Sequence, residues 1–198
     1  MKIGLTGGIA TGKSTVAALL VERGALLVDA DQVAREVVMP GESALEAVAS
    51  KFGQAVLHND GTLNRPALGK IVFNNRDLLA QLEGILHPAI RVRMQQRIRQ
   101  HELEYPERLV VADVPLLYET EQQALYDGIM VVYVPHQLQL ERLMQRNSIT
   151  EEEATRRITL QMDIEEKKRR ADWVIDNSGT IEETTRQIDV FWKSQGLR

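Results

Sequence analysis

Short apolar runs alternate with longer amphipathic stretches along the 198 residues of this chain. The runs that predict buried strands span residues 2–6, 25–28, 108–117, 128–135 and 171–177. Each is followed by a helical pattern, and strands that alternate with helices build a parallel sheet with helices on both faces. The pattern therefore predicts an α/β fold around a five-stranded parallel sheet.

The chain between the second and third strands carries a helical pattern. Helices are expected from Gln32 and over residues 43–52. Residues 66–104 are interpreted as three helices in succession, the longest from about Pro88 to Glu104. We therefore expect a helical insertion over residues 32–107, in a core made of residues 1–31 and 108–198.

A glycine-rich segment separates the first strand from the first helix, which is expected over residues 16–21. The segment GGIATGKS, residues 7–14, fits the pattern G-x-x-x-x-G-K-[ST] without a mismatch. Glycines let successive N–H groups turn toward an anion, and the start of the helix adds free N–H groups and a positive dipole end. Lys13 is placed to reach the β- and γ-phosphates of ATP, and the Ser14 hydroxyl to bind Mg²⁺.

This loop is therefore predicted to hold a nucleoside triphosphate. The alternative is a glycine-rich turn with a lysine that faces solvent, and the flanking strand and helix favour the nucleotide site. The residues expected to bind this nucleotide are Gly8, Ala10, Thr11, Gly12, Lys13, Ser14, Thr15 and Val16.

Two aspartates fall where the second and third strands are expected to end, which is where ligands gather in a parallel sheet. Asp31 is placed to accept a proton from an attacking hydroxyl or to orient that hydroxyl, but it equally fits the N-cap of a helix that starts at Gln32. Asp113 follows LVVA and resembles the acidic residue that ends a strand and helps to hold Mg²⁺. Its alternative is a turn former at the strand end.

The helix expected after the fourth strand, HQLQLERLMQRN, has two different faces. Leu140, Leu143 and Met144 share an apolar face, whereas Arg142 and Arg146 lie on another. Arginine presents a planar, permanently charged fork to phosphate oxygens, so this stripe suits a lid over phosphates at residues 142–168. The alternative is a solvated face paired with acidic neighbours.

Two further segments carry candidate polar groups. His87 and Pro88 come before the long helix, with Arg91 one turn further on, and we expect His87 and Arg91 to position a substrate. The run KKRR at residues 167–170 adjoins Glu165 and Glu166, so it indicates a helix with internal salt bridges rather than a nucleic-acid patch.

Composition narrows the function classes. Hydrophobic residues make up 43% and charged residues 26%, as in a soluble globular protein, and the net charge of −4 argues against a nucleic-acid partner. The absence of cysteine excludes disulfides and a thiol nucleophile. No apolar run approaches the roughly 18 residues of a membrane span, and the start of the chain lacks a signal-peptide pattern, so no membrane partner and a cytoplasmic location are expected. The oligomeric state stays open between a monomer and a small homo-oligomer.

Taken together, these motifs resemble the dephospho-coenzyme A kinase family of P-loop kinases. The resemblance runs nearly from end to end, through IGLTGGIATGKST, DADQVAREVV, LEGILHPAIR, DVPLLYE, QLERLMQRN and ADWVIDNSGT. The P-loop alone marks only a superfamily, whereas its combination with LHPAIR and DVPLLYE is far more specific.

The resemblance implies a reaction and a role for each part of the chain. ATP would phosphorylate the ribose 3′-hydroxyl of dephospho-coenzyme A, with a helical substrate domain at the insertion and a small helical lid. By this comparison Lys13, Asp31 and Arg142 are catalytic, Arg146 and Asn177 contact the nucleotide, and Asn177 lies near the adenine. Asp31, His87 and Arg91 contact the acceptor.

Two other functions remain as alternatives. Another small-molecule or nucleotide P-loop kinase would have the same core and differ in the insertion. A GTPase-like switch would carry D-x-x-G after an early strand and an N-K-x-D motif. Residues 176–179 spell D-x-x-G, but on the last strand, and N-K-x-D is absent.

Overall fold

A computed structural model describes residues 1–197, which form two compact units. Unit 1 comprises Met1–Val28 and Ile98–Arg198, and unit 2 comprises Asp29–Arg97. No helix within residues 1–197 is both long and apolar enough to cross a membrane.

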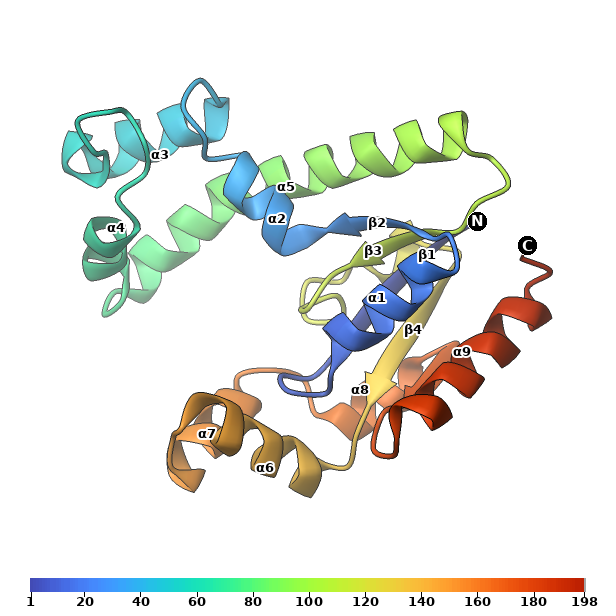
Figure 1. Cartoon of the computed structure of the whole chain (residues 1–198). Coiled ribbons are helices and arrows are strands. Elements are labelled where there is room, and N and C mark those ends of the chain that lie inside the picture. The colour runs from blue at the N-terminus through green and yellow to red at the C-terminus, as the bar shows by residue number, and fades with distance from the viewer. Residues whose placement is uncertain (198) are drawn as a thin grey trace. The chain divides into compact units, whose positions relative to one another are not determined.

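Five strands form one sheet in the order β2-β3-β1-β4-β5 (Figure 1). Parallel pairing joins β1 to β3 and β4, and joins β4 to β5, which confirms the predicted α/β fold with a parallel sheet. The strands are β1 Lys2–Gly7, β2 Leu26–Asp29, β3 Val110–Asp113, β4 Gly128–Tyr133 and β5 Trp173–Asp176. Register places Leu5 opposite both Asp113 and Met130, so the ends of β1, β3 and β4 meet at one edge.

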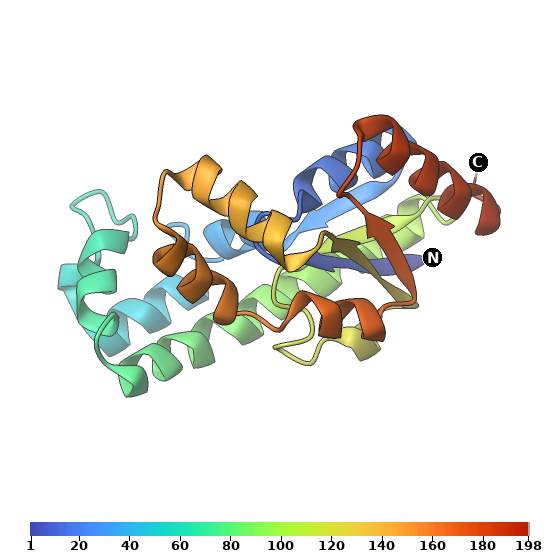
Figure 2. The ribbon, with the colours of Figure 1, turned by 90° about the horizontal axis from the view of Figure 1, so that it is seen from below.

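The remaining regular structure of unit 1 is helical. The helices are α1 Lys13–Glu22, α6 His136–Asn147, α7 Glu151–Thr159, α8 Ile164–Arg170, α9 Ile181–Ser194 and the last turns of α5, with the short 3₁₀ helix η2 Gln123–Leu125. Helices α1 and α9 lie side by side (Figure 1), and α8 and α9 flank β5 on opposite sides (Figure 2).

The largest apolar cluster of unit 1 lies between the sheet and helices α1 and α9. Val16 and Leu20 of α1 meet Ile188 and Phe191 of α9 over Leu5 of β1, and all five are almost completely buried. Burying a side chain of this kind contributes about 1.5–3 kcal/mol. The cluster therefore fixes the start of α1, and with it the loop that precedes α1.

Unit 2 is helical. It contains α2 Ala30–Glu36, α3 Ser43–Phe52, the 3₁₀ helix η1 Gln54–Val56, α4 Arg65–Val72 and most of α5 Arg76–Glu104. Val48, Val56, Leu68, Val72 and Leu82 form its own core. Ion pairs join Arg93 to Glu42 and Arg97 to Glu36 at its surface.

The expectation of three helices over residues 66–104 is wrong. Residues 65–104 form two helices. The second, α5, is 29 residues long in total and continues through Pro88. Proline removes one backbone donor and crowds the carbonyl four residues earlier, which usually ends a helix. Here buried side chains on either side of the proline, Leu82 and Met94, hold both halves of α5 in place.

The segment between β3 and β4 also differs from the expectation of a helix after every strand. Turns and η2 fill residues 114–127, with no α-helix. The segment instead presents the backbone oxygen of Pro115 to neighbouring side chains, which matters for the site described next.

Candidate active site

The loop between β1 and α1 has the backbone shape of an anion-binding nest. Ala10 has φ 63° and Gly12 has φ 84°, both in the left-handed region. Alternating backbone of this kind turns successive N–H groups to one side. Gly12 is required on two grounds, because a Cβ there would also lie 2.1 Å from Nδ2 of Asn177.

Two of the residues predicted to bind the nucleotide have buried side chains. Thr11 is fully buried, and its hydroxyl donates to the carbonyl oxygen of Gly8 over 2.9 Å. Val16 is fully buried in the core cluster, and its N–H is bonded to the carbonyl of Gly12. Ser14 and Thr15, by contrast, are exposed in the first turn of α1.

Lys13 and Asp113 form an ion pair across the end of the sheet. The Lys13 ammonium contacts Oδ1 of Asp113, and their side chains are 19% and 9% exposed. Lys13 begins α1 and Asp113 ends β3, so register and helix start together bring these predicted residues to one place.

The donor set near Asp113 suits magnesium bound with a nucleotide. Within residues 1–197 no cluster of three or more His, Cys, Asp or Glu side chains is arranged to hold a metal ion by itself. Mg²⁺ in kinase sites is held by one or two protein oxygens together with substrate phosphates. The Ser14 hydroxyl and the Asp113 carboxylate fit that requirement.

A cavity of about 480 Å³ opens above this loop. Its walls come from three separate parts of unit 1: the loop and α1, helix α6, and the segment around β5 and α9. They are Ala10, Gly12, Ser14, Thr15, Arg142, Gln145, Arg146, Asn177 and Ile181. The cavity therefore joins an anion nest to a surface that carries two arginines.

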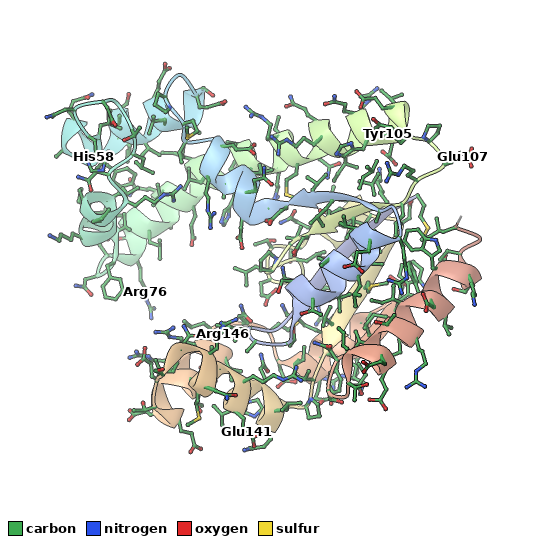
Figure 3. All side chains as sticks on the ribbon, viewed as in Figure 1. His58, Arg76, Tyr105, Glu107, Glu141 and Arg146 are labelled. Atoms are coloured by element: carbon green, nitrogen blue, oxygen red, sulfur yellow. The ribbon has the colours of Figure 1, made fainter. Side chains whose placement is uncertain are left out.

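Helix α6 supplies those arginines as its pattern predicted. Leu140 and Leu143 are buried against Ala154 and Ile158 of α7, with Met144 packed beside them. Arg142 and Arg146 lie on another face and line the cavity. Figure 3 labels Arg146 on one side of α6 and Glu141 on the opposite side.

Two glutamines that the sequence analysis did not single out for this role bond the tip of the loop. The backbone N–H of Ile9 donates to Oε1 of Gln161 over 2.7 Å. The backbone carbonyl of Ile9 accepts from Nε2 of Gln139 over 2.8 Å. Gln139 belongs to α6 and Gln161 follows α7, so both ends of this helix pair are bonded to the loop. The only sequence signal for these bonds was a polar residue on an amphipathic helix, and that signal is weak.

Asn177 is directed into the protein rather than toward a base. Its Nδ2 donates to the carbonyl of Thr11, and its Oδ1 accepts from the Thr184 hydroxyl, each over 2.9 Å. Only 9% of Asn177 is exposed. Its side-chain amide therefore braces the loop through one donor and one acceptor.

In unit 2, Asp29 takes the capping role that was an alternative for Asp31. Oδ1 of Asp29 accepts from the N–H groups of Asp31 and Gln32, over 2.7 and 3.2 Å. Helix α2 consequently starts at Ala30 rather than Gln32. Asp31 lies exposed in the first turn, two residues beyond the end of β2.

His87 and Arg91 lie on the exposed surface of α5 in unit 2. A separation of four residues puts them on the same helix face.

Helix α8 has the internal salt bridges predicted for KKRR, but Lys167 is buried instead of taking part in them. Glu166 does form surface ion pairs with Arg169 and Arg170. Lys167 is completely buried, 2.9 Å from Oε1 of Glu119, and it donates to backbone oxygens of Gly7 and Pro115. Burial lowers the pKa of the Lys167 ammonium, and the Glu119 carboxylate opposes that shift.

Comparisons with known proteins identify relatives of this chain. The model of the dephospho-CoA kinase family matches residues 1–183. A dephospho-CoA kinase of Bacillus cereus (strain ATCC 10987) is 50% identical over 197 residues, covering 98% of this chain and 97% of the relative. One from Halalkalibacterium halodurans is 48% identical over 196 residues, with 98% and 97% covered. The structure of a dephospho-CoA kinase from Campylobacter jejuni is 29% identical and superposes with a TM-score of 0.68, covering 97% of this chain and 96% of that one.

Proposed function

This chain belongs to the dephospho-CoA kinase family, and we propose that it transfers the γ-phosphoryl group of ATP to the ribose 3′-hydroxyl of dephospho-coenzyme A. The observation that carries the proposal is the cavity in which an anion nest, the Ser14 hydroxyl and two arginines face the same space. Phosphoryl transfer needs little covalent help from the protein and depends on positioning and charge. That cavity offers both.

The loop residues and Lys13 would bind the phosphates. Backbone N–H groups around Ala10 and Gly12, and the free N–H groups at the start of α1, favour an anion there. Ser14 and Asp113 would hold Mg²⁺, which neutralises charge between the β- and γ-phosphates. The pairing of Lys13 with Asp113 supports this, since both groups then lie beside the same phosphates.

Arg142 and Arg146 would complete the charge around the transferred group. Arg142 is half-buried and Arg146 is exposed, and both line the cavity. A well-placed arginine at a phosphoryl transition state is worth about 10³–10⁵ in kcat. We propose that residues 142–168 act as the lid that excludes water, because water competes with the alcohol for the phosphoryl group.

Unit 2 would bind the acceptor. The capping role of Asp29 leaves the carboxylate of Asp31 available to take a proton from the 3′-hydroxyl or to orient that hydroxyl. His87 and Arg91 would position the substrate from the α5 surface. A cytoplasmic location agrees with such a biosynthetic role and stays a prediction.

The test is an acceptor panel with purified protein, ATP and Mg²⁺. ADP release is followed with dephospho-coenzyme A, nucleoside monophosphates and small alcohols, and the product is identified by mass and by ³¹P NMR. We expect dephospho-coenzyme A to give the highest kcat/KM, with a 3′-phosphate in the product. Chelation by EDTA should stop turnover, and added Mg²⁺ should restore it.

A nucleoside monophosphate that outcompetes dephospho-coenzyme A would contradict the substrate assignment and leave another P-loop kinase. Retention of full activity in EDTA would contradict the roles of Ser14 and Asp113 in binding Mg²⁺.

A further inference from the structure

The Lys167 ammonium lies at a buried junction of three chain segments. It donates to the carbonyl of Gly7 over 3.3 Å and to that of Pro115 over 3.1 Å, and Oε1 of Glu119 is 2.9 Å away. An ammonium has three donors, and each of them here has an oxygen partner. No part of the Lys167 side chain is exposed.

Two of these partners belong to the phosphate-binding machinery. Gly7 ends β1 and is the first residue of the phosphate-binding loop. Pro115 comes two residues after Asp113, and its carbonyl also accepts from the buried Thr6 hydroxyl over 3.1 Å. Lys167 therefore links the base of the loop that carries Lys13 to the strand end that carries Asp113.

The third partner extends the link toward the segment after α7. Oε1 of Glu119 also accepts from the backbone N–H of Met162 over 2.8 Å. Met162 follows Gln161, whose side chain bonds Ile9 at the tip of the same loop. The base and the tip of the loop are thus both connected to residues 161–167.

A buried lysine is costly unless it is paired and hydrogen-bonded. A helix with the same surface salt bridges would form with an apolar residue at position 167, so helix formation alone does not account for this ammonium. Burial and the nearby Lys13 ammonium both lower the pKa of Lys167, so the charge of Lys167 lies close to that of Lys13. Glu119 is the carboxylate that opposes them.

We propose that Lys167, held by Glu119, is a positioning residue for phosphoryl transfer: it fixes the base of the phosphate-binding loop relative to the strand that carries Asp113. The inference rests on the proposed kinase function for its kinetic readout. It goes beyond that function, because Lys167 acts through Gly7 and Pro115 and need not touch the substrate.

The test compares Lys167→Met, Glu119→Gln and the double variant with the wild type. Each single change leaves a buried charge without its counter-charge and should lower the melting temperature, whereas the double change removes both charges and should recover much of it. The matched control is Lys168→Met, the same substitution one residue further along α8 at an exposed position.

The measurements are the melting temperature, kcat, KM for dephospho-coenzyme A, and the Kd for ADP. A misplaced loop should lower kcat by about 10²-fold in the double variant. The Kd for ADP should rise about tenfold, as expected for a weakened set of charge-assisted hydrogen bonds. KM for dephospho-coenzyme A should stay within about threefold, because the acceptor does not bind this loop. Lys168→Met loses a cation–π contact with Tyr133 and should keep the wild-type kcat and Kd for ADP.

A double variant with wild-type kcat and ADP affinity would overturn the proposal. So would a loss of kcat that only follows the fraction of unfolded protein, with ADP affinity unchanged. If Lys167→Met is too unstable to assay, Glu119→Gln and the double variant decide the question. ADP binding needs no acceptor, so it tests this inference even if dephospho-coenzyme A proves not to be the substrate.

Discussion

Nδ2 of Asn177 donates a 2.9 Å hydrogen bond to the backbone oxygen of Thr11, so the segment that follows the last strand braces the phosphate-binding loop from inside the protein. The same amide occupies the space that a side chain at position 12 would need. The identities of Gly12 and Asn177 are therefore linked through one contact.

Asn177→Ala should weaken both the fold and nucleotide binding. The substitution leaves the buried carbonyl of Thr11 without this donor, which costs about 1–3 kcal/mol. Urea unfolding should show that loss, and KM for ATP should rise. Thr185→Ala is the control, because Thr185 is only partly buried and bonds only within α9 in the described contacts. An Asn177→Ala protein with unchanged stability and KM would contradict the bracing role.

Lys13→Met should abolish turnover while the protein stays folded. The change removes the cation expected at the β- and γ-phosphates, and the loss of one such charge lowers kcat by about 10³-fold or more. ADP release measures turnover, and far-UV circular dichroism checks the fold. Lys193→Met, at the exposed end of α9, is the matched control. Activity within about tenfold of wild type would argue against the phosphate-binding assignment.

The two aspartates at the start of α2 should separate into a structural and a chemical role. Asp29→Ala removes the cap of α2 and should cost about 1 kcal/mol in unfolding free energy. Asp31→Asn should leave stability unchanged and lower kcat more than it raises KM for ATP. Urea unfolding and initial rates measure both variants. Equal losses of kcat and ATP binding in Asp31→Asn would contradict its place next to the acceptor hydroxyl.

Tyr118 should contribute stability that disappears at high pH. Burial, aided by the negative charge of Asp172, raises the pKa of its hydroxyl to about 12 from an ordinary value of 10.0. Because the folded-state pKa is the higher one, this contribution is fully present below pH 10 and is lost as pH rises toward 12. The stability difference between wild type and Tyr118→Phe should therefore shrink over that interval. Urea unfolding at several pH values tests this, with Tyr105→Phe as an exposed control.

The sequence was most informative where local pattern determines local structure. The spacing from Gly7 to Ser14 identified the nucleotide loop, because a short backbone segment alone builds the anion nest. The faces of α6 followed from helix geometry, which correctly separated Leu140 and Leu143 from Arg142. Thr180 and Glu183 form a capping box at the start of α9, with the three-residue spacing that such boxes require.

Features that depend on tertiary contacts were missed. Lys167 and Lys168 are adjacent and chemically identical, yet only the first is buried, and that difference arises from Gly7, Pro115 and Glu119 elsewhere in the chain. Pro88 predicts a helix end by local rules, and packing on both sides overrides it. The side-chain direction of Asn177 depends on Thr11, 166 residues away in the sequence, and on the Thr184 hydroxyl in the following helix.

The two glutamine bonds to Ile9 have a mechanical consequence. A hinge movement of α6 and α7 would also move the loop tip, because Gln161 is bonded to the N–H of Ile9 and Gln139 to its carbonyl. If residues 142–168 move as the proposed lid, nucleotide capture and ADP release would share one set of bonds, and the rate of ADP release would depend on these amides as well as on the arginines.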